Sequence, residues 1–357
     1  MIKVLIVDDS ALMRRQLVSL FEAESDFEIR LARNGREALE ENISFRPDVI
    51  TLDINMPEMD GLTALSLLMQ ERPVAVVMVS SLTEKGALAT FEALALGAVD
   101  YVAKPSGTIS LSIDMIRQEV VSKVRAAARA KLKTARGLST RIRAESHPSV
   151  PPPAQPAAPA LVRRGIVGEG LVIIGVSTGG PRTLEDILPL LPPDFPWPVL
   201  VAQHMPASFT LPFANRMNDL CQLQVVEVSR PMPLEPGTVY VGKGGADIVV
   251  VKRAGKLTVL ARPESTDFLW HPSVELMGRS VLEHCDLSRV IGVMLTGMGY
   301  DGADAFTDIK RKGGRTIAES EESSVVFGMP AELIKRGGAS VVLHAGKIAN
   351  QIIAWTR

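Results

Sequence analysis

Apolar runs alternate with helix-periodic stretches over the first third of the chain. The clearest runs lie at residues 2–7, 48–54, 74–80 and 100–104, and a weaker one lies at residues 27–32. Between them, apolar positions recur with the spacing of an amphipathic helix. Strands that alternate with helices predict βα units around a parallel sheet. Helices on both faces of such a sheet explain why the strands are almost wholly apolar.

The same alternation resumes near residue 168. Apolar runs at residues 171–177, 197–204 and 289–297 predict buried strands. Four shorter runs within residues 223–260 are separated by turn signals such as "PGT" and "KGG", and they predict an antiparallel insertion. We therefore expect a second α/β domain with a mostly parallel sheet.

The residues between these two patterns have a different composition. Residues 123–165 contain ten Lys or Arg and one Glu, and they include the tract "PPPAQPAAPA". The basic part can extend the last helix of the first domain, whereas the proline tract favours extended conformations and supplies no core. The basic residues suit a solvated helix face or an acidic partner surface. We expect a first domain at residues 1–122, a linker at 123–167 and a second domain at 168–357.

Length and composition agree with two globular domains. A chain of 357 residues is longer than one ordinary hydrophobic core requires, and its net charge of −1 gives it no bulk attraction to nucleic acid. No apolar run approaches the roughly 18 residues of a membrane span, and two acids stand where a signal peptide would continue its apolar core. We expect a cytoplasmic protein without membrane insertion. Cys221 and Cys285 lack the spacing of a metal or redox motif.

Acidic residues follow the predicted strands of the first domain. Asp8 and Asp9 come after the first strand, and Asp53 ends the third. The carboxyl ends of parallel strands meet at one edge of a sheet, so these carboxylates are expected to converge. Their repulsion favours a bound cation, and hard oxygen ligands suit Mg²⁺. With Lys104 ending the fifth strand, Asp53 is a candidate phosphoryl acceptor, because both cations offset the charge of a transferred phosphoryl group.

Four motifs occur in order in this domain: "VLIVDDS", "DVITLDINMPEMDG", "MVSS" and "DYVAKP". Together they resemble a two-component response-regulator receiver domain. The resemblance implies a flavodoxin-like, five-stranded parallel sheet and phosphorylation of Asp53 by a sensor histidine kinase. It implies that Mg²⁺ is held by Asp8, Asp9, Asp53 and the backbone carbonyl of Asn55. The positions implied for the phosphoryl contact and the conformational switch are Lys104, Ser80 and Tyr101.

The stretch "GVSTGG" at residues 175–180 joins a predicted strand to a predicted helix. A dinucleotide-binding turn is one interpretation, but Val and Ser stand where G-x-G needs its second glycine, and the next strand ends in Gln203 and His204 rather than an acid. A tight turn whose serine caps the helix is another. In the third, G-x-S-x-G exposes the hydroxyl of Ser177 as a nucleophile at a helix N-terminus.

A serine nucleophile needs a base, and the base needs an orienting acid. His204 follows the strand "WPVLVAQ", and Asp301 stands just before the predicted helix "GADAFTDIKRK", so both fall on the same sheet edge as Ser177. Asp304 is a rival acid one turn into that helix. His271 opens "HPSVELM" and is a candidate substrate contact. The order Ser, His, Asp differs from the Ser, Asp, His order of α/β-hydrolases.

Five motifs in the second domain, "GVSTGGP", "QHMP", "HPSVELM", "LTGMGYDGA" and "SSVVFGMP", resemble the catalytic domain of the chemotaxis protein-glutamate methylesterase family. The resemblance implies hydrolysis of γ-glutamyl methyl esters on methyl-accepting chemoreceptors, deamidation of receptor glutamines, and no cofactor in this domain. It implies Ser177 as nucleophile, His204 as base and Asp301 as orienting acid. It also implies site-lining positions at Thr178 and Met298.

Receiver and catalytic domains in one chain suggest regulation. We expect the unphosphorylated receiver to cover the catalytic edge and phosphorylation to weaken that docking. The alternative is a phosphorylation-controlled binding module without catalysis. A DNA-binding regulator is disfavoured, because the second domain has no compact helix-turn-helix pattern.

Overall fold

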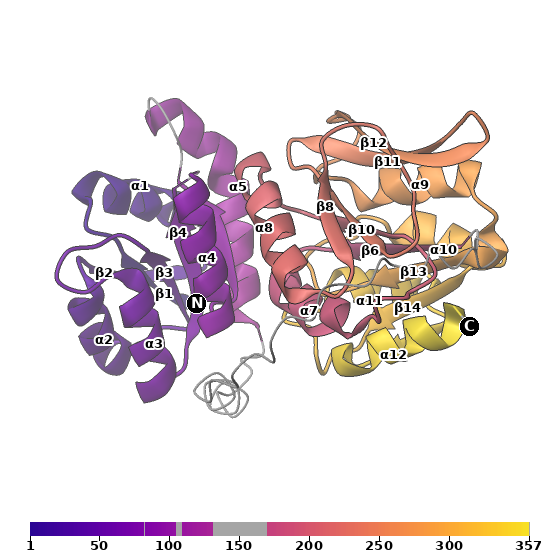
Figure 1. The fold of residues 1–357 in the computed structure, drawn as a ribbon. Coiled ribbons are helices and arrows are strands. Elements are labelled where there is room, and N and C mark those ends of the chain that lie inside the picture. Colours follow the sequence, from indigo (N-terminus) through magenta and orange to yellow (C-terminus); the bar gives the residue numbers. More distant parts are fainter. Residues whose placement is uncertain (82, 105–108, 131–169, 357) are drawn as a thin grey trace, which may run out of the picture.

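Two α/β units lie side by side in the computed structural model, the N-terminal one in indigo to magenta and the C-terminal one in red to yellow (Figure 1). The structure describes every residue except 82, 105–108, 131–169 and 357. The proline-rich tract of the expected linker therefore lies outside the described residues.

The N-terminal unit is built on sheet A, in which five parallel strands follow the order β2-β1-β3-β4-β5. The strands are β1 (Ile2–Val7), β2 (Phe27–Ala32), β3 (Val49–Asp53), β4 (Ala75–Ser80) and β5 (Asp100–Ala103). The helices are α1 (Ala11–Glu22), α2 (Gly35–Ser44), α3 (Gly61–Glu71), α4 (Glu84–Leu96) and α5 (Ile109–Ala128). This strand order is flavodoxin-like, so the predicted five-stranded parallel sheet is confirmed.

Both faces of sheet A are covered by helices. On β1, Leu5 and Val7 belong to the apolar cluster formed with α2, α3 and α4, whereas Val4 and Ile6 belong to the cluster formed with α1 and α5. Successive side chains of a strand point to opposite faces, so a strand covered on both sides must be apolar throughout.

The C-terminal unit is built on sheet B, in which seven parallel strands follow the order β15-β14-β13-β6-β7-β10-β8. Its strands are β6 (Leu171–Val176), β7 (Val199–Gln203), β8 (Gln224–Val228), β10 (Thr238–Gly242), β13 (Val290–Met294), β14 (Arg315–Glu319) and β15 (Val341–Leu343). Its α-helices are α7 (Gly180–Ile187), α8 (Ala207–Leu220), α9 (Val274–His284), α10 (Ala303–Arg311), α11 (Met329–Lys335) and α12 (Ala345–Thr356).

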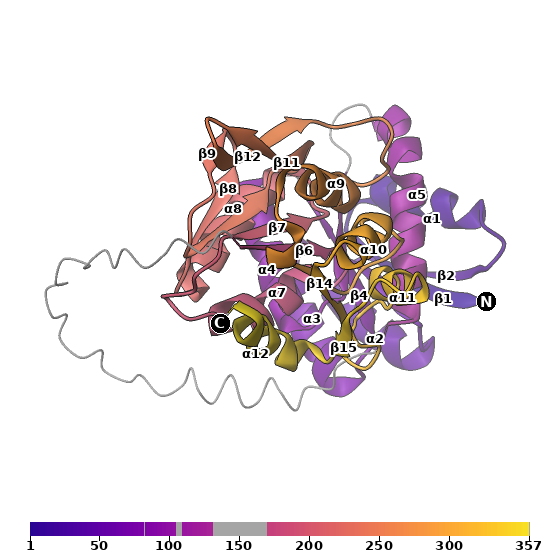
Figure 2. The ribbon, with the colours of Figure 1, turned by 90° about the vertical axis from the view of Figure 1, so that its right-hand side faces the viewer.

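Sheet B is also covered on both faces. Buried residues of α7, α8 and α12 pack on one face, and buried residues of α9, α10 and α11 pack on the other. Figure 2 shows α9, α10 and α11 in a row along one side of the sheet. Two short 3₁₀ helices, Leu188–Leu190 and Leu287–Arg289, lie in the connections.

The predicted antiparallel insertion is only partly correct. Strands β11 (Ala246–Arg253), β12 (Lys256–Pro263) and β9 (Met232–Pro233) form the antiparallel sheet C, but β8 and β10 are parallel strands of sheet B. All of β10 is buried, so its apolar run reflects a strand covered on both faces rather than a hairpin strand. The β11–β12 hairpin turns at Ala254 and Gly255, whose φ angles of 47° and 78° suit a tight two-residue turn.

The two units share one apolar cluster where α4 meets α8 (Figure 1). The Phe91 ring on α4 lies 6.1 Å from the Phe209 ring and 5.6 Å from the Phe213 ring on α8, between centroids. Tyr101 on β5 stacks on Phe209 with a centroid distance of 4.7 Å and an interplanar angle of 12°. Aromatic contacts between buried rings stabilise this interface beyond the area that they bury.

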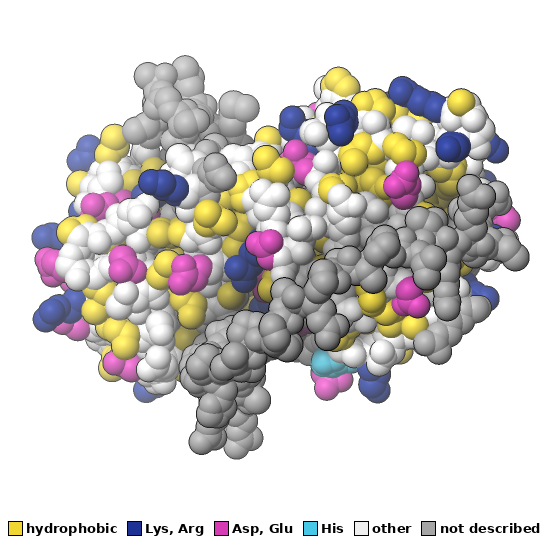
Figure 3. Space-filling model, viewed as in Figure 1, with side chains coloured by type: hydrophobic (Ala, Val, Ile, Leu, Met, Phe, Trp, Pro, Cys, Tyr) yellow, Lys and Arg dark blue, Asp and Glu magenta, His cyan; other side chains and the backbone are white. Residues whose placement is uncertain are grey.

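The exposed surface is chemically mixed. On the face drawn in Figure 3, Lys, Arg, Asp and Glu side chains are interspersed with hydrophobic groups. Among the described helices, none combines the length and the apolar character that crossing a bilayer requires.

Phe306 anchors α10 in the C-terminal unit. The ring is fully buried, and Cβ atoms added at Gly278 of α9 and Gly292 of β13 would approach it to 3.5 Å and 3.0 Å. Gly292 thus leaves space that the ring fills, whereas Gly278 leaves space for Ala305, whose Cβ an added Cβ at Gly278 would approach to 2.6 Å.

We expect Phe306→Ala to lower the free energy of unfolding of this unit by about 3–5 kcal/mol, because it removes a fully buried ring. Urea denaturation followed by circular dichroism measures the change. Leu190→Ala is the control, because Leu190 is 56% exposed and its loss is expected to change stability by about 0.5 kcal/mol or less. Equal effects of both substitutions would contradict this account of the packing.

Candidate active site and acidic cluster

Three carboxylates meet at the carboxyl edge of sheet A. Asp8 and Asp53 are buried and Asp9 is exposed, and one ligand atom from each lies within 4.8 Å of the others. Lys104 Nζ lies 3.0 Å from Asp8 Oδ2 and 2.8 Å from Asp53 Oδ2. Clustered carboxylate oxygens are the hard ligands that Mg²⁺ prefers, so these residues fit the expected metal.

The local fold brings the reactive positions of this cluster together. A Cβ at Gly61 would lie 2.0 Å from the backbone oxygen of Asp53, so only glycine allows α3 to begin this close to β3. Asn55, whose N–H donates to Asp53 Oδ1 at 3.4 Å, lies in the same loop. Ser80 ends the neighbouring strand and its buried hydroxyl donates to the Gly86 carbonyl at 3.2 Å.

Tyr101 points away from the cluster. Its ring is buried against Phe209, and its hydroxyl has no hydrogen-bond partner among the described residues. Burial raises the pKa of Tyr101 well above its usual value. The predicted switch tyrosine therefore lies in the interface between the two units.

Opposing effects act on the pKa of Asp53. Burial raises the pKa of Asp53, and although the Lys104 ammonium lowers it, the net pKa stays above the ordinary range. For Lys104, burial lowers the pKa, but Asp53 and Asp8 raise it more. A divalent cation would stabilise the ionised carboxylates of Asp53 and Asp8 by offsetting their charge.

Ser177 and His204 lie at adjacent strand ends of sheet B. Val176 of β6 is in register with Gln203 of β7, so the next residues, Ser177 and His204, follow side by side. The His204 N–H donates to the Val176 carbonyl at 3.1 Å, and the Ser177 N–H donates to the Thr296 carbonyl at 3.0 Å. Ser177 is half-buried and its Oγ makes no hydrogen bond to any described residue.

His204 is held by one ring nitrogen. Its Nε2 lies 2.8 Å from Asp301 Oδ2, and its Nδ1 is buried without a hydrogen-bond partner in the described part of the chain. An imidazole that donates from Nε2 to a carboxylate leaves Nδ1 as a proton acceptor. Catalytic hydrogen bonds often shorten only when substrate binds, so the missing serine contact is compatible with a base.

Asp301 lies at the start of α9 in space, although it precedes α10 in sequence. It accepts from Ser273 Oγ at 3.1 Å, from the Val274 N–H at 2.7 Å and from the Glu275 N–H at 3.0 Å. Burial raises the pKa of Asp301, but the hydrogen bond from His204 and the α9 amides lower it more, so the net pKa lies below its ordinary value. The carboxylate is therefore ionised at neutral pH.

The rival acid Asp304 does not reach His204. Its side chain is 64% exposed and pairs at 2.8 Å with Arg336, which directly follows α11. The structure thus brings Asp301 to the imidazole and leaves Asp304 at the surface.

The loop after β13 closes over Ser177. A Cβ at Gly297 would lie 2.7 Å from Ser177 Cβ, so a side chain there would collide with the candidate nucleophile. Met298, half-buried, is the next residue in this loop. Thr296 Oγ1 donates to the Thr178 carbonyl at 2.9 Å and thereby ties the loop to the serine turn.

Thr178 contacts the N-terminal unit. Its hydroxyl donates to Asp100 Oδ2 at 2.7 Å, across the interface. Val325, in the loop before α11, also packs against the core cluster of the N-terminal unit. The N-terminal unit therefore contacts the C-terminal unit at the residue next to Ser177.

Sequence reasoning missed Trp270, which lies beside His204, and Tyr300, which lies beside Trp270. The Trp270 ring is nearly parallel to the His204 ring at a centroid distance of 6.0 Å, and Tyr300 meets Trp270 edge-on at 5.3 Å. Trp270, Tyr300 and Asp301 line a cavity of about 190 Å³. The only sequence signal for Trp270 was its position directly before the motif that opens with His271. The His271 ring itself contacts Asp247 through Nδ1, at 2.8 Å.

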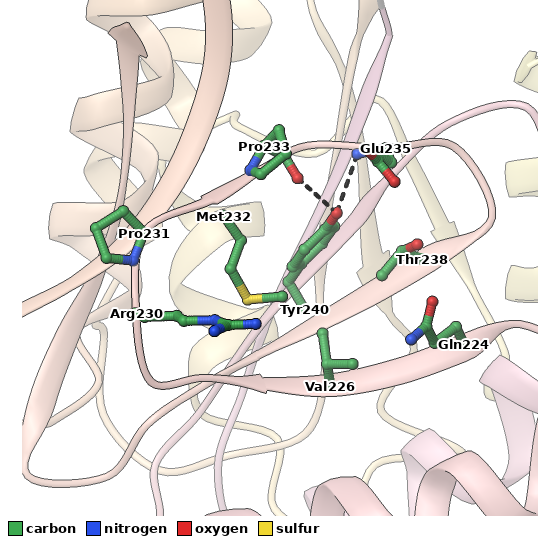
Figure 4. Close-up of a pocket in the computed structure, with 9 residues that line it drawn as sticks. All are labelled: Gln224, Val226, Arg230, Pro231, Met232, Pro233, Glu235, Thr238 and Tyr240. Atoms are coloured by element: carbon green, nitrogen blue, oxygen red, sulfur yellow. Dashed lines mark hydrogen bonds between the residues drawn. The ribbon is translucent and has the colours of Figure 1, made fainter.

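A second cavity, of about 440 Å³, lies away from these residues beside β8 and β10 (Figure 4). Tyr240 lies in its wall, with its hydroxyl donating to the Pro233 carbonyl at 2.8 Å and accepting from the Glu235 N–H at 3.0 Å. The Tyr240 hydroxyl is thus held by the backbone of the segment that leads into β10.

Comparisons with known proteins cover the whole chain. The family model described as CheB methylesterase matches residues 172–352, and the response regulator receiver domain model matches residues 4–115. A protein-glutamate methylesterase/protein-glutamine glutaminase of Rhodospirillum rubrum is 57% identical over 356 residues, which are 99% of this chain and 96% of the relative. One from Rhodopseudomonas palustris is 52% identical over 363 residues, covering 99% of this chain and 98% of the relative.

A solved structure resembles the C-terminal unit. The catalytic domain of the CheB methylesterase of Thermotoga maritima is 38% identical, with a TM-score of 0.51, and the match covers 53% of this chain and 99% of that domain.

The raised pKa of Asp53 predicts the direction in which stability changes with pH. Because the folded state raises its pKa, ionised Asp53 destabilises the fold above that pKa. Without divalent cations, Asp53→Asn is expected to raise the thermal midpoint at pH 7, and the gain is expected to shrink as the pH falls and the wild-type carboxyl protonates. Differential scanning fluorimetry from pH 7 to pH 4 measures both, and added Mg²⁺ is expected to stabilise the wild type more than the variant.

Asp60→Asn is a control for which the opposite effect on stability is expected. The Thr63 N–H bond lowers the pKa of this helix cap, so its ionised form stabilises the fold and the contribution is lost as the pH falls through the folded pKa. If Asp53→Asn lowered the thermal midpoint at pH 7, ionised Asp53 would not destabilise the fold and this account would be wrong.

Proposed function

Because the chain belongs to the CheB methylesterase family and carries a response regulator receiver domain, we propose that it is a phosphorylation-regulated, serine-dependent protein-glutamate methylesterase. Its substrates in this proposal are γ-glutamyl methyl esters of methyl-accepting chemoreceptors, and its output is sensory adaptation in chemotaxis. The observation that carries the proposal is the His204–Asp301 pair beside Ser177 at the carboxyl edge of sheet B.

In the acylation step, Ser177 Oγ gives its proton to His204 Nδ1 and attacks the ester carbonyl carbon. The carbonyl oxygen takes up the negative charge of a tetrahedral intermediate. His204 then returns the proton to the methoxy oxygen, the carbon–oxygen bond breaks, and methanol leaves an acyl-enzyme. Water, deprotonated by the same nitrogen, cleaves the acyl-enzyme to a glutamate carboxylate and free serine.

Asp301 keeps the imidazole in the reactive tautomer. Its carboxylate accepts the Nε2–H proton, which leaves Nδ1 available for the serine proton, and its charge stabilises the imidazolium that forms. The lowered pKa of Asp301 supports this role, because a neutral carboxyl would lose the charge.

Backbone N–H groups of the serine turn and of the Met298 loop are the proposed oxyanion donors. The Thr296 hydroxyl bridge between these two loops supports the assignment, because it fixes their relative position. One such donor contributes about 3 kcal/mol to barrier lowering. A glutamine amide follows the same path, with ammonia leaving in place of methanol, so the same residues account for deamidation.

The receiver domain is the proposed regulator, with a sensor histidine kinase as phosphodonor. Asp8, Asp9 and Asp53 would hold Mg²⁺, which would offset charge on the transferred phosphoryl group. Asp100 and Tyr101, which contact Thr178 and Phe209, lie on the strand that leads to Lys104. Phosphorylation of Asp53 changes the environment of Lys104 and Ser80, and we infer that this weakens the contacts of the adjoining strand with the catalytic domain.

We expect Ser177→Ala to lower kcat for methanol release from a methylated receptor fragment at least about 1,000-fold, and Asp301→Asn to lower it about 10,000-fold through the wrong imidazole tautomer. Asp304→Asn, the same change on an exposed carboxylate of the next helix, is expected to stay within about twofold of wild type. Gas chromatography of released methanol measures the rates. Full activity of folded Ser177→Ala would remove the nucleophile assignment. Tight receptor binding without any methanol release by the wild type would favour the binding-module alternative.

Interface truncation is expected to mimic phosphorylation. Phe91→Ala removes the receiver ring that packs on Phe209 and Phe213, so basal activity without phosphodonor is expected to rise about 5- to 150-fold. Leu88→Ala on the same helix is the control, because Leu88 is 53% exposed. The ratio of activities with and without a small-molecule phosphodonor measures the coupling. Unchanged basal activity of folded Phe91→Ala would exclude inhibition through this contact.

A further inference from the structure

A second buried carboxylate lies behind Asp301. Asp247, the second residue of β11, is fully buried and accepts hydrogen bonds from three donors. His271 Nδ1 lies 2.8 Å from its Oδ1, the Ser273 N–H donates to the same oxygen at 2.8 Å, and the Ser265 N–H donates to Oδ2 at 2.9 Å. Burying a carboxylate is costly unless such donors compensate it, so its place in an apolar hairpin strand calls for an explanation.

The donors of Asp247 belong to the turn that holds Asp301. Ser273 donates its N–H to Asp247 and its hydroxyl to Asp301 Oδ1, so one residue joins the two carboxylates. The next two N–H groups, at Val274 and Glu275, also bind Asp301. Asp247 therefore holds the start of the turn at Ser273. The end of this turn, at Val274 and Glu275, holds Asp301, the acid that orients His204.

The segment that leads into this turn also packs against the face of the His204 ring. Trp270, directly before His271, lies parallel to the His204 ring. A single segment, residues 270–275, thus sets both the ring face and the carboxylate that His204 contacts. A small displacement of this segment would move both contacts together, and displacements of about 1 Å in a catalytic group can cost about 100-fold in rate.

We propose that Asp247 and His271 are positioning residues for catalysis, which align Asp301 and through it His204. This inference rests on the proposed esterase function. It gives the His271 side chain a role inside the protein, through its hydrogen bond to Asp247, rather than a contact with substrate.

The test compares Asp247→Ala, which removes all three acceptor contacts, with His271→Leu, which removes only the imidazole donor. In the full-length, phosphodonor-activated protein, both are expected to lower kcat about 10- to 100-fold with KM changed by about twofold or less. The acid limb of the kcat/KM profile is expected to move to lower pH, because a displaced Asp301 stabilises the His204 imidazolium less. The double variant is expected to lose little more than the worse single variant.

Two matched variants separate positioning from stability. His271→Asn can present an amide N–H near the position of Nδ1 and is expected to recover most of the activity that His271→Leu loses. Val259→Ala truncates a fully buried residue of the paired strand β12 without touching the network, and it is expected to lower stability while leaving the pH profile unchanged. Activities are compared at equal folded fraction.

A measurement that needs no substrate tests the positioning role independently of the esterase function. In ¹⁵N-histidine-labelled protein, proton NMR follows the His204 Nε2–H that bonds Asp301, and this signal is expected to shift upfield or broaden in Asp247→Ala and His271→Leu but not in Val259→Ala. Unchanged kcat, pH profile and NMR signal in folded His271→Leu would overturn the positioning role. If the wild type released no methanol while the NMR shifts appeared, the esterase proposal would fail and the structural coupling would stand.

Discussion

The negative charge of Asp301 must be compensated where it lies, because it is buried at the meeting point of α9, α10 and the end of β7. One ring nitrogen, one hydroxyl and two backbone amides converge on it. The helix that supplies the amides, α9, is separated in sequence from α10, which Asp301 precedes, by strand β13. Charge compensation therefore locks two helices and an imidazole into one arrangement, and the chemistry proposed for Ser177 depends on that arrangement.

The two domains use the same architectural device for different chemistry. In each, a parallel sheet gathers polar side chains at its carboxyl edge, while helices on both faces keep the rest of each strand apolar. Sheet A presents carboxylates around a lysine, which suits a cation and a phosphoryl group. Sheet B presents a hydroxyl and an imidazole. The interface joins them directly, since β5 of sheet A contributes both Asp100 and Tyr101 to it.

The alternation of apolar and helical segments was sufficient to predict the strands of sheet A and the strands β6, β7 and β13 of sheet B, and strand ends led directly to the candidate residues Asp53, Ser177 and His204. The pattern failed at β10, because a short strand buried on both faces has the same apolar run as a hairpin strand, and at β8, a partly exposed strand at the edge of sheet B. It also gave no indication of Asp247, and for Trp270 it gave only the position next to His271. Their neighbours at the site are decided by how the β11–β12 hairpin and the turn before α9 fold back on sheet B, and no local periodicity records such a long-range contact.

The aromatic cluster at the interface bears on the energetics of the proposed release of the receiver. Phe91 and Tyr101 cover the rings of Phe209 and Phe213, so separation of the receiver would expose these two rings to water. Exposing rings of this size costs on the order of 1.5–3 kcal/mol each. In the proposed regulation, the hydrophobic effect would therefore favour the return of the receiver to the arrangement seen here once the phosphoryl group is lost.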